Sequence, residues 1–147
     1  MTDILDPIDI SLSRRVLLAK EWFELYKKGE VVFDSTSKSK VWTYEKMSKF
    51  IESILLRFPL ENIFAEEDPH NRYIIIDGKR RLKTIFLFLN NDFALCELKF
   101  YPEFNGKKFF ELPRNKQRVI EETPLNFFSI AHWVSTATKE DFKNRVK

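Results

Sequence analysis

The sequence holds only one cysteine, two histidines and three glycines in 147 residues. The single thiol, Cys96, excludes a disulfide framework or a cysteine zinc cluster within one chain. His70 and His132 stand in no metal-ligand pattern. No apolar run follows a basic N-terminal stretch, and none reaches the roughly 18 apolar residues of a membrane span. We therefore expect a soluble, cytoplasmic protein without a signal peptide and without a membrane partner.

What the chain does have is enough apolar material for one core. Hydrophobic residues make up 44% of the chain and aromatic residues 15%, including 15 phenylalanines. A chain of this length predicts a single domain over residues 1–147. The net charge of +3 and the pI of about 8.9 permit an anionic partner but do not demand one.

Hydrophobic periodicity and capping residues predict helices alternating with short strands. The expected helices run from Ser11 or Ser13 to 28, from the cap Thr43 to 57, from 79 to 89 and from 113 to 122. The strand candidates are 31–33, 63–65, 74–76, 93–101, 109–110 and 125–134, with polar connections at 34–40 and 66–72.

The segment from Tyr73 to Thr84 is the strongest candidate for a functional site. It reads as a buried strand, an Asp77-Gly78 turn and a helix in which four of the five residues from Lys79 to Lys83 are cationic. A helix N-terminus already carries partial positive charge and unpaired N–H groups, so added cations are unfavourable unless an anion is bound. The pattern indicates a site for a polyphosphate or a nucleic-acid backbone.

Each residue of this segment suits a phosphate site in a different way. Gly78 lets the backbone approach a phosphate, and Arg80 and Arg81 can fork onto its oxygens. Asp77 can hold Mg²⁺, orient an arginine or act as a base toward water. The alternative is a simple Asp-Gly turn followed by a solvated helix face. Arg81 fits that alternative poorly, because it lies beside the apolar stripe of the helix.

At these residues the chain resembles the N-terminal domain of GmrSD-type restriction and phage-defence proteins, within the ParB/sulfiredoxin-like fold. The resemblance covers about residues 29–130. It is carried by an ordered set of motifs: Val41-Trp42, Ile51-Glu52-Ser53-Ile54-Leu55, Pro59, Ile76-Asp77-Gly78-Lys79-Arg80-Arg81-Leu82-Lys83-Thr84, Asn105-Gly106-Lys107-Lys108-Phe109 and Leu112-Pro113.

The resemblance implies a compact α+β domain in which helices flank a small mixed sheet. It further implies that this domain binds a nucleoside triphosphate with Mg²⁺ and, in some members, hydrolyses it to license DNA cleavage. It implies nucleotide, DNA and a separate nuclease subunit or domain as partners. The residues expected at the site are Asp77, Arg81 and Glu52 as catalytic groups, Gly78, Lys79, Arg80, Arg81, Thr84 and Lys38 as nucleotide ligands, and Asp77 as the metal ligand.

The chain departs from the family pattern at two places near this site. The family's glutamine before the arginine is Arg80 here, which makes Gly78-Lys79-Arg80-Arg81 similar to the triphosphate-gripping box of ParB. Binding is thereby favoured over hydrolysis. Ahead of Trp42 the family's Y-Q-R reads Thr36-Ser37-Lys38, with Lys38 in place of the arginine.

Three functions remain to be distinguished. The first is a nucleoside-triphosphate-binding domain, hydrolytic or not, that controls DNA processing as an NTPase or as part of a nucleotide-gated nickase. The second is a catalytically degenerate copy that binds DNA or a partner subunit. The third, a nuclease in its own right, ranks last because no multi-carboxylate or histidine metal site is visible in the sequence.

Overall fold

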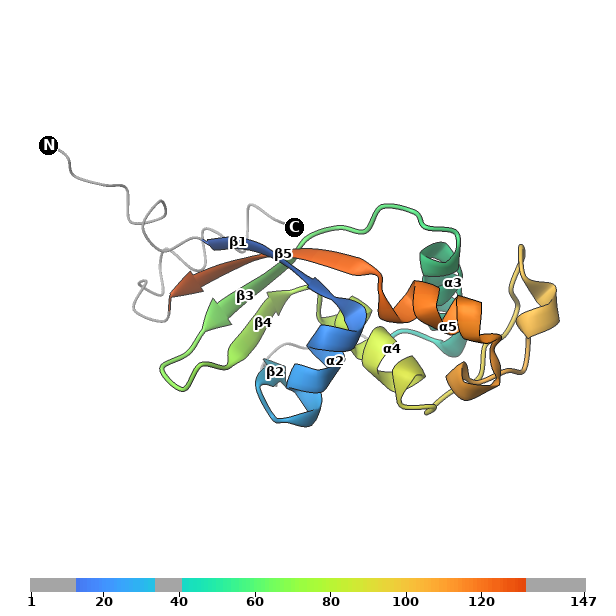
Figure 1. Ribbon diagram of the computed structural model, residues 1–147, viewed down its shortest axis with the longest axis horizontal. Coiled ribbons are helices and arrows are strands. Elements are labelled where there is room, and N and C mark those ends of the chain that lie inside the picture. Colours follow the sequence, from blue (N-terminus) through green and yellow to red (C-terminus); the bar gives the residue numbers. More distant parts are fainter. Residues whose placement is uncertain (1–12, 34–40, 132–147) are drawn as a thin grey trace, which may run out of the picture.

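The computed structural model describes residues 13–33 and 41–131 of the chain (Figure 1). A five-stranded mixed sheet has the order β1-β5-β3-β4-β2. The pairs β1–β5 and β3–β4 are antiparallel, whereas β5–β3 and β4–β2 are parallel. The elements are β1 (Ser13–Leu18), α2 (Ala19–Lys27), β2 (Val31–Phe33), α3 (Tyr44–Leu55), β3 (Ile63–Glu67), β4 (Tyr73–Asp77), α4 (Lys79–Leu89), the 3₁₀ turns η1 (Pro102–Phe104) and η2 (Phe109–Glu111), α5 (Arg114–Glu121) and β5 (Pro124–Ala131).

The helices and the sheet share one aromatic-rich core. In Figure 1 the strands lie to one side of the molecule, α3, α4 and α5 gather at the other, and α2 runs beside β2. Trp22 of α2 is fully buried, and its ring centre lies 4.9 Å from that of Phe127 of β5 and 5.5 Å from that of Tyr73 of β4, both in edge-to-face arrangements. The expected α+β class with a small mixed sheet is confirmed. No helix within the described ranges is long and apolar enough to cross a membrane.

Several elements form where the sequence predicted them. The Thr43 hydroxyl caps α3 by accepting the Lys46 N–H at 3.2 Å. The predicted α4 runs from Lys79 to Leu89, with Asn90 as its C-cap. Strand β4 is less buried than expected, because only its middle residue Ile75 is fully buried.

The first predicted helix begins later than its sequence pattern suggested. Ser13 does not cap a helix, because residues 13–18 form strand β1 and pair along β5. The helix starts at Ala19, where the Glu21 carboxylate accepts the N–H of Leu18 at 2.8 Å. Pairing with β5 satisfies the backbone of this segment and overrides its local preference. Ser11, the other cap candidate, lies outside the described residues.

The segment from 93 to 101 was predicted as a strand and is irregular instead. Its apolar side chains Phe93, Leu95 and Leu98 are buried, which explains the alternation seen in the sequence. Its backbone bonds to side chains and turns rather than to a neighbouring strand, for example Leu98 N–H to the Asn105 side-chain oxygen at 2.9 Å. The predicted strand at 109–110 is likewise the 3₁₀ turn η2.

The connector predicted at 66–72 is shorter than expected. Strand β3 continues through Glu67, and a tight turn around Asp68 leads into β4. The buried Asp68 carboxylate accepts backbone N–H groups of His70 at 2.9 Å and Arg72 at 2.8 Å, and the Arg72 guanidinium at 2.7 Å. One side chain therefore organises the whole β3–β4 turn.

This turn should make part of the stability depend on acid pH. Burial raises the pKa of Asp68, but the hydrogen bonds from Arg72 and His70 outweigh it and hold the pKa below its usual range. A depressed folded-state pKa gives stability that is present above the unfolded value of about 4 and is lost as pH falls through the folded value. Urea unfolding between pH 7 and pH 2.5 should show this loss, and Asp68→Asn should lack it. Parallel pH profiles for the two proteins would contradict the assignment.

Candidate functional site

The predicted strand–turn–helix site lies at an edge of the sheet where two parallel strands end. Strands β2 and β4 are parallel, with Phe33 opposite Ile75. Their carboxyl ends therefore open onto the same edge, and α4 begins there directly after Gly78. In open sheets with parallel strands, ligands bind at this end of the strands.

Gly78 has a conformation and a position that require glycine. It is the N-cap of α4 with φ +102° and ψ 14°, in the left-handed region. A Cβ atom there would lie 2.4 Å from Ile63 Cδ1 and 3.3 Å from Arg81 Nη2. The first backbone bond of α4 runs from Leu82 N–H to the Gly78 carbonyl at 3.0 Å. The N–H groups before it have no partner within the helix, and the first turn carries no acidic residue.

Arg81 points inward, as its place beside the apolar stripe predicted. Its guanidinium donates to the carbonyl of Glu61 at 2.6 Å and to that of Asn62 at 3.4 Å, and lies 3.6 Å from the Asp77 carboxylate. Its side chain is 15% exposed. Arg81 therefore ties the start of α4 to the segment that precedes β3 and holds Asp77 in place.

The exposed cations of the site converge on one aromatic ring. Arg80, in the first turn of α4, lies 5.7 Å from the centre of the Trp42 ring, and Lys46, in the first turn of α3, lies 5.2 Å from it. Both side chains belong to exposed residues, and within the described ranges neither forms an ion pair. Trp42 itself packs edge-on against Phe50 at 5.6 Å. The N-terminal ends of α3 and α4 are thus neighbours. The partial positive charges of the two helix N-termini therefore lie near the same ring as the two cationic side chains.

Asp77 is the carboxylate that could hold a metal at this site. Its side chain is 36% exposed, so one face of the carboxylate reaches solvent while Arg81 holds the other. Mg²⁺ is commonly held by one or two carboxylates together with substrate phosphates. Asp77 fits that chemistry as a single ligand beside a bound polyphosphate.

The other predicted site residues lie elsewhere or are engaged differently. Thr84 is 1% exposed and donates its hydroxyl to the Arg80 carbonyl at 2.7 Å, so it does not reach the surface of the site. Glu52 is 5% exposed and accepts the backbone N–H groups of residues 99–101 at 2.7 to 3.2 Å. Lys79 is half-buried at the first position of α4. Lys38 lies outside the described residues.

Sequence reasoning missed Lys46 as a member of this site. It lies in a helix whose cap, Thr43, and preceding aromatic residue, Trp42, were both identified. The one available signal was that Lys46 follows Trp42 by four residues. Residues at that spacing are neighbours on a helix, but Trp42 precedes the helix, so their contact also depends on the geometry of the cap. The approach of Arg80 of α4 to the same ring depends on tertiary packing and has no local signal.

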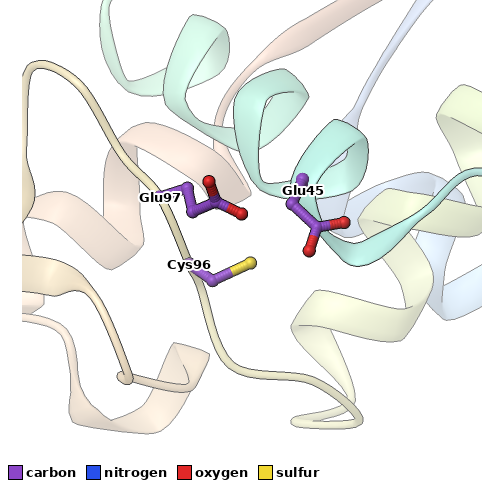
Figure 2. Close-up of side chains that lie close together, drawn as sticks. All are labelled: Glu45, Cys96 and Glu97. Atoms are coloured by element: carbon purple, nitrogen blue, oxygen red, sulfur yellow. The ribbon is translucent and has the colours of Figure 1, made fainter.

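A second group of potential ligand atoms lies at the first turn of α3. Figure 2 shows Glu45 of α3 and the consecutive residues Cys96 and Glu97 pointing toward one another, with one ligand atom from each within 4.8 Å of the others. The Cys96 N–H donates to Ser48 Oγ at 3.0 Å, which fixes this segment against α3. Exposed acidic groups often gather without an ion, so the cluster alone does not indicate a metal centre.

Comparison with known proteins agrees with the ordered motifs. No curated protein matches the chain. Residues 24–146 match the family described as GmrSD restriction endonuclease, N-terminal domain. The matched range includes β2, Trp42, α3, β4, the Gly78 cap and α4, and therefore every part of the site described above. The chain belongs to the family of GmrSD restriction endonuclease N-terminal domains.

Proposed function

We propose that this domain binds a nucleoside triphosphate whose phosphates lie against the adjoining N-terminal ends of α3 and α4. The observation that carries the proposal is the convergence of Arg80 and Lys46 on the Trp42 ring, two exposed cations that have no carboxylate partner within the described ranges. Cations at helix N-termini oppose the helix dipole, and a bound polyanion reverses that cost.

The residues of the site take different parts in this proposal. Arg80 offers a planar fork of donors to phosphate oxygens, and Lys46 adds a mobile point charge. Gly78 supplies the left-handed N-cap from which α4 begins, and the place of a Cβ atom there is already occupied by the side chains of Ile63 and Arg81. Arg81 acts as a positioning residue, because its guanidinium is engaged by Glu61, Asn62 and Asp77.

Mg²⁺ would be held by Asp77 together with the phosphates. When bound, the ion supplies charge neutralisation for the triphosphate. Asp77 keeps a solvent-facing side while it pairs with Arg81, which fits a single protein ligand. We further propose that nucleotide binding controls DNA processing in phage defence through a nuclease subunit or domain, in keeping with the restriction-endonuclease family.

The test is the affinity of the protein for ATP, GTP, CTP and UTP, with and without Mg²⁺, by titration calorimetry. Arg80→Ala and Lys46→Ala should each weaken binding of the preferred nucleotide about tenfold or more, because each removes a charge-assisted contact. Arg118→Ala, an exposed arginine on α5, serves as the matched control and should leave affinity unchanged. Absence of binding by the unaltered protein would overturn the proposal. Equal affinities for Arg80→Ala and Arg118→Ala would place the phosphates elsewhere.

A DNA-binding module without nucleotide dependence is the second candidate. Cations stacked on an aromatic ring, as Arg80 and Lys46 are on Trp42, also suit a single-stranded nucleic-acid backbone. This reading predicts that a fluorescent single-stranded oligonucleotide binds in the absence of nucleotide, with an affinity that falls steeply as salt rises. An anisotropy titration at 50 and 200 mM salt distinguishes the two, and no measurable binding at the lower salt excludes this candidate.

A further inference from the structure

A small aromatic pocket lies between α2, β2 and α4, one helical turn beyond the cations of the site. Its cavity of about 240 Å³ is open to solvent. Four aromatic side chains form its walls: Phe23, Tyr26, Phe33 and Phe86. Tyr26 stacks on Phe86 with ring centres 4.5 Å apart and planes 19° apart. Because clefts for drug-sized ligands exceed about 300 Å³, this pocket suits a single planar ring system.

The polar groups of the pocket are divided between its two ends. Lys83 lies 5.1 Å from the centre of the Phe33 ring and forms no ion pair within the described residues. Asn90 and Asp92 lie at the other end, where the Asn90 side-chain amide donates to Asp92 Oδ2 at 3.0 Å. That bond leaves the amide oxygen of Asn90 and the second oxygen of Asp92 as acceptors. The pocket is thus cationic at one end and accepts hydrogen bonds at the other.

The cationic end faces the proposed phosphate site along one stripe of α4. Arg80, Lys83, Leu87 and Asn90 follow at helical spacings of three, four and three, so they share a face of the helix. From Arg80 to Asn90 this face is about 15 Å long. A nucleoside triphosphate laid along it would place its phosphates at Arg80, pass Lys83, and bring its base against the rings that line the pocket.

We propose that the pocket between α2, β2 and α4 binds the base of the nucleotide. The inference rests on the proposed nucleotide binding and adds to it the place and the chemistry of base recognition. The free acceptors of Asn90 and Asp92 select a base edge that presents N–H donors, and guanine presents two adjacent donors on one edge. Uracil offers a single donor there and is disfavoured.

The experiment compares GTP, UTP and inorganic tripolyphosphate as ligands of the full chain by calorimetry. Tyr26→Ala removes an exposed wall of the pocket and should weaken GTP binding about tenfold, since stacking of a base on an aromatic ring is worth that much. It should leave tripolyphosphate binding unchanged. Phe58→Ala, a 57% exposed aromatic residue after α3, is the control and should change neither affinity.

Asp92→Asn tests the edge that reads the base. It should reduce the preference for GTP over UTP severalfold while tripolyphosphate binds as before. If GTP binds and Tyr26→Ala binds it as tightly as the unaltered protein, the base lies elsewhere and the pocket inference is overturned while the proposed function stands. If neither GTP, UTP nor tripolyphosphate binds, both fall. An unchanged GTP-to-UTP ratio in Asp92→Asn overturns the assignment of the base edge.

Discussion

Replacing Glu52 with alanine is expected to lower the free energy of unfolding by about 3–5 kcal/mol. The Glu52 carboxylate is buried within α3 and accepts three consecutive backbone N–H groups, from Lys99 at 3.2 Å, Phe100 at 2.7 Å and Tyr101 at 3.0 Å. Removing it leaves these three donors, whose hydrogen bonds are part-buried, without their acceptor. Each buried donor left unpaired costs about 1–3 kcal/mol.

The matched control for this change lies on the same helix. Glu45 is exposed at the first turn of α3, and no hydrogen bond or ion pair holds its carboxylate among the described residues. Glu45→Ala should therefore change stability by less than about 1 kcal/mol. Urea unfolding followed by tryptophan fluorescence measures both. Equal destabilisation by the two substitutions would show that the segment 99–101 does not depend on the Glu52 carboxylate.

The importance of Glu52 was visible in the sequence, but its role was not. A glutamate at mid-helix is usually a surface residue, and the motif around it suggested a place near the nucleotide. Its three partners are 47 to 49 positions away in the chain, in a segment without regular structure. Backbone donors of an irregular loop carry no sequence signature, because any residue presents the same N–H group. Only the fold shows that Glu52 supports a loop.

The elements that were predicted correctly have strong local causes. Helix α4 has an apolar stripe at helical spacing and a glycine before its first turn, and α3 has the Thr43 cap. The misassigned segments lack such causes. Residues 13–18 become a strand because β5, more than 100 positions later, offers a pairing edge. Residues 93–101 bury alternate apolar side chains without pairing with another strand. The alternation in the sequence therefore reflects burial, and the prediction of a strand from it was wrong.

The sequence predicted which segment forms the site, but not which side chains from different elements come together there. The order Asp77, Gly78 and a cationic helix start is local, and the structure confirms the strand, the turn and the helix. Which cations face outward depends on packing. Arg81 turns in to the carbonyls of Glu61 and Asn62, whereas Arg80 lies near the Trp42 ring, as Lys46 does. Arg80 and Arg81 look equivalent in the sequence, but in the fold Arg81 has a structural role and Arg80 is exposed.

Replacing Gly78 with alanine is expected to cost about 3 kcal/mol of stability, the second large effect. Two independent penalties combine there. An L-residue with φ +102° is strained by about 1–2 kcal/mol. In addition, the new Cβ would lie 2.4 Å from Cδ1 of the fully buried Ile63, so a packed side chain must shift. The clash is with the core beneath the turn that starts α4.

Gly29 allows the two penalties to be separated. Its backbone conformation is similar to that of Gly78, but no atom lies where a Cβ would be added. Its φ is +78°, and a Cβ there meets nothing within 4 Å. Gly29→Ala should therefore cost only the backbone strain, about 1 kcal/mol, so the difference between the two variants in urea unfolding measures the contact with Ile63. Equal losses would mean that the core around Ile63 yields freely. In that case the start of α4 would also yield to a bound phosphate, and the cations on α3 and α4 would be less fixed than the proposed site requires.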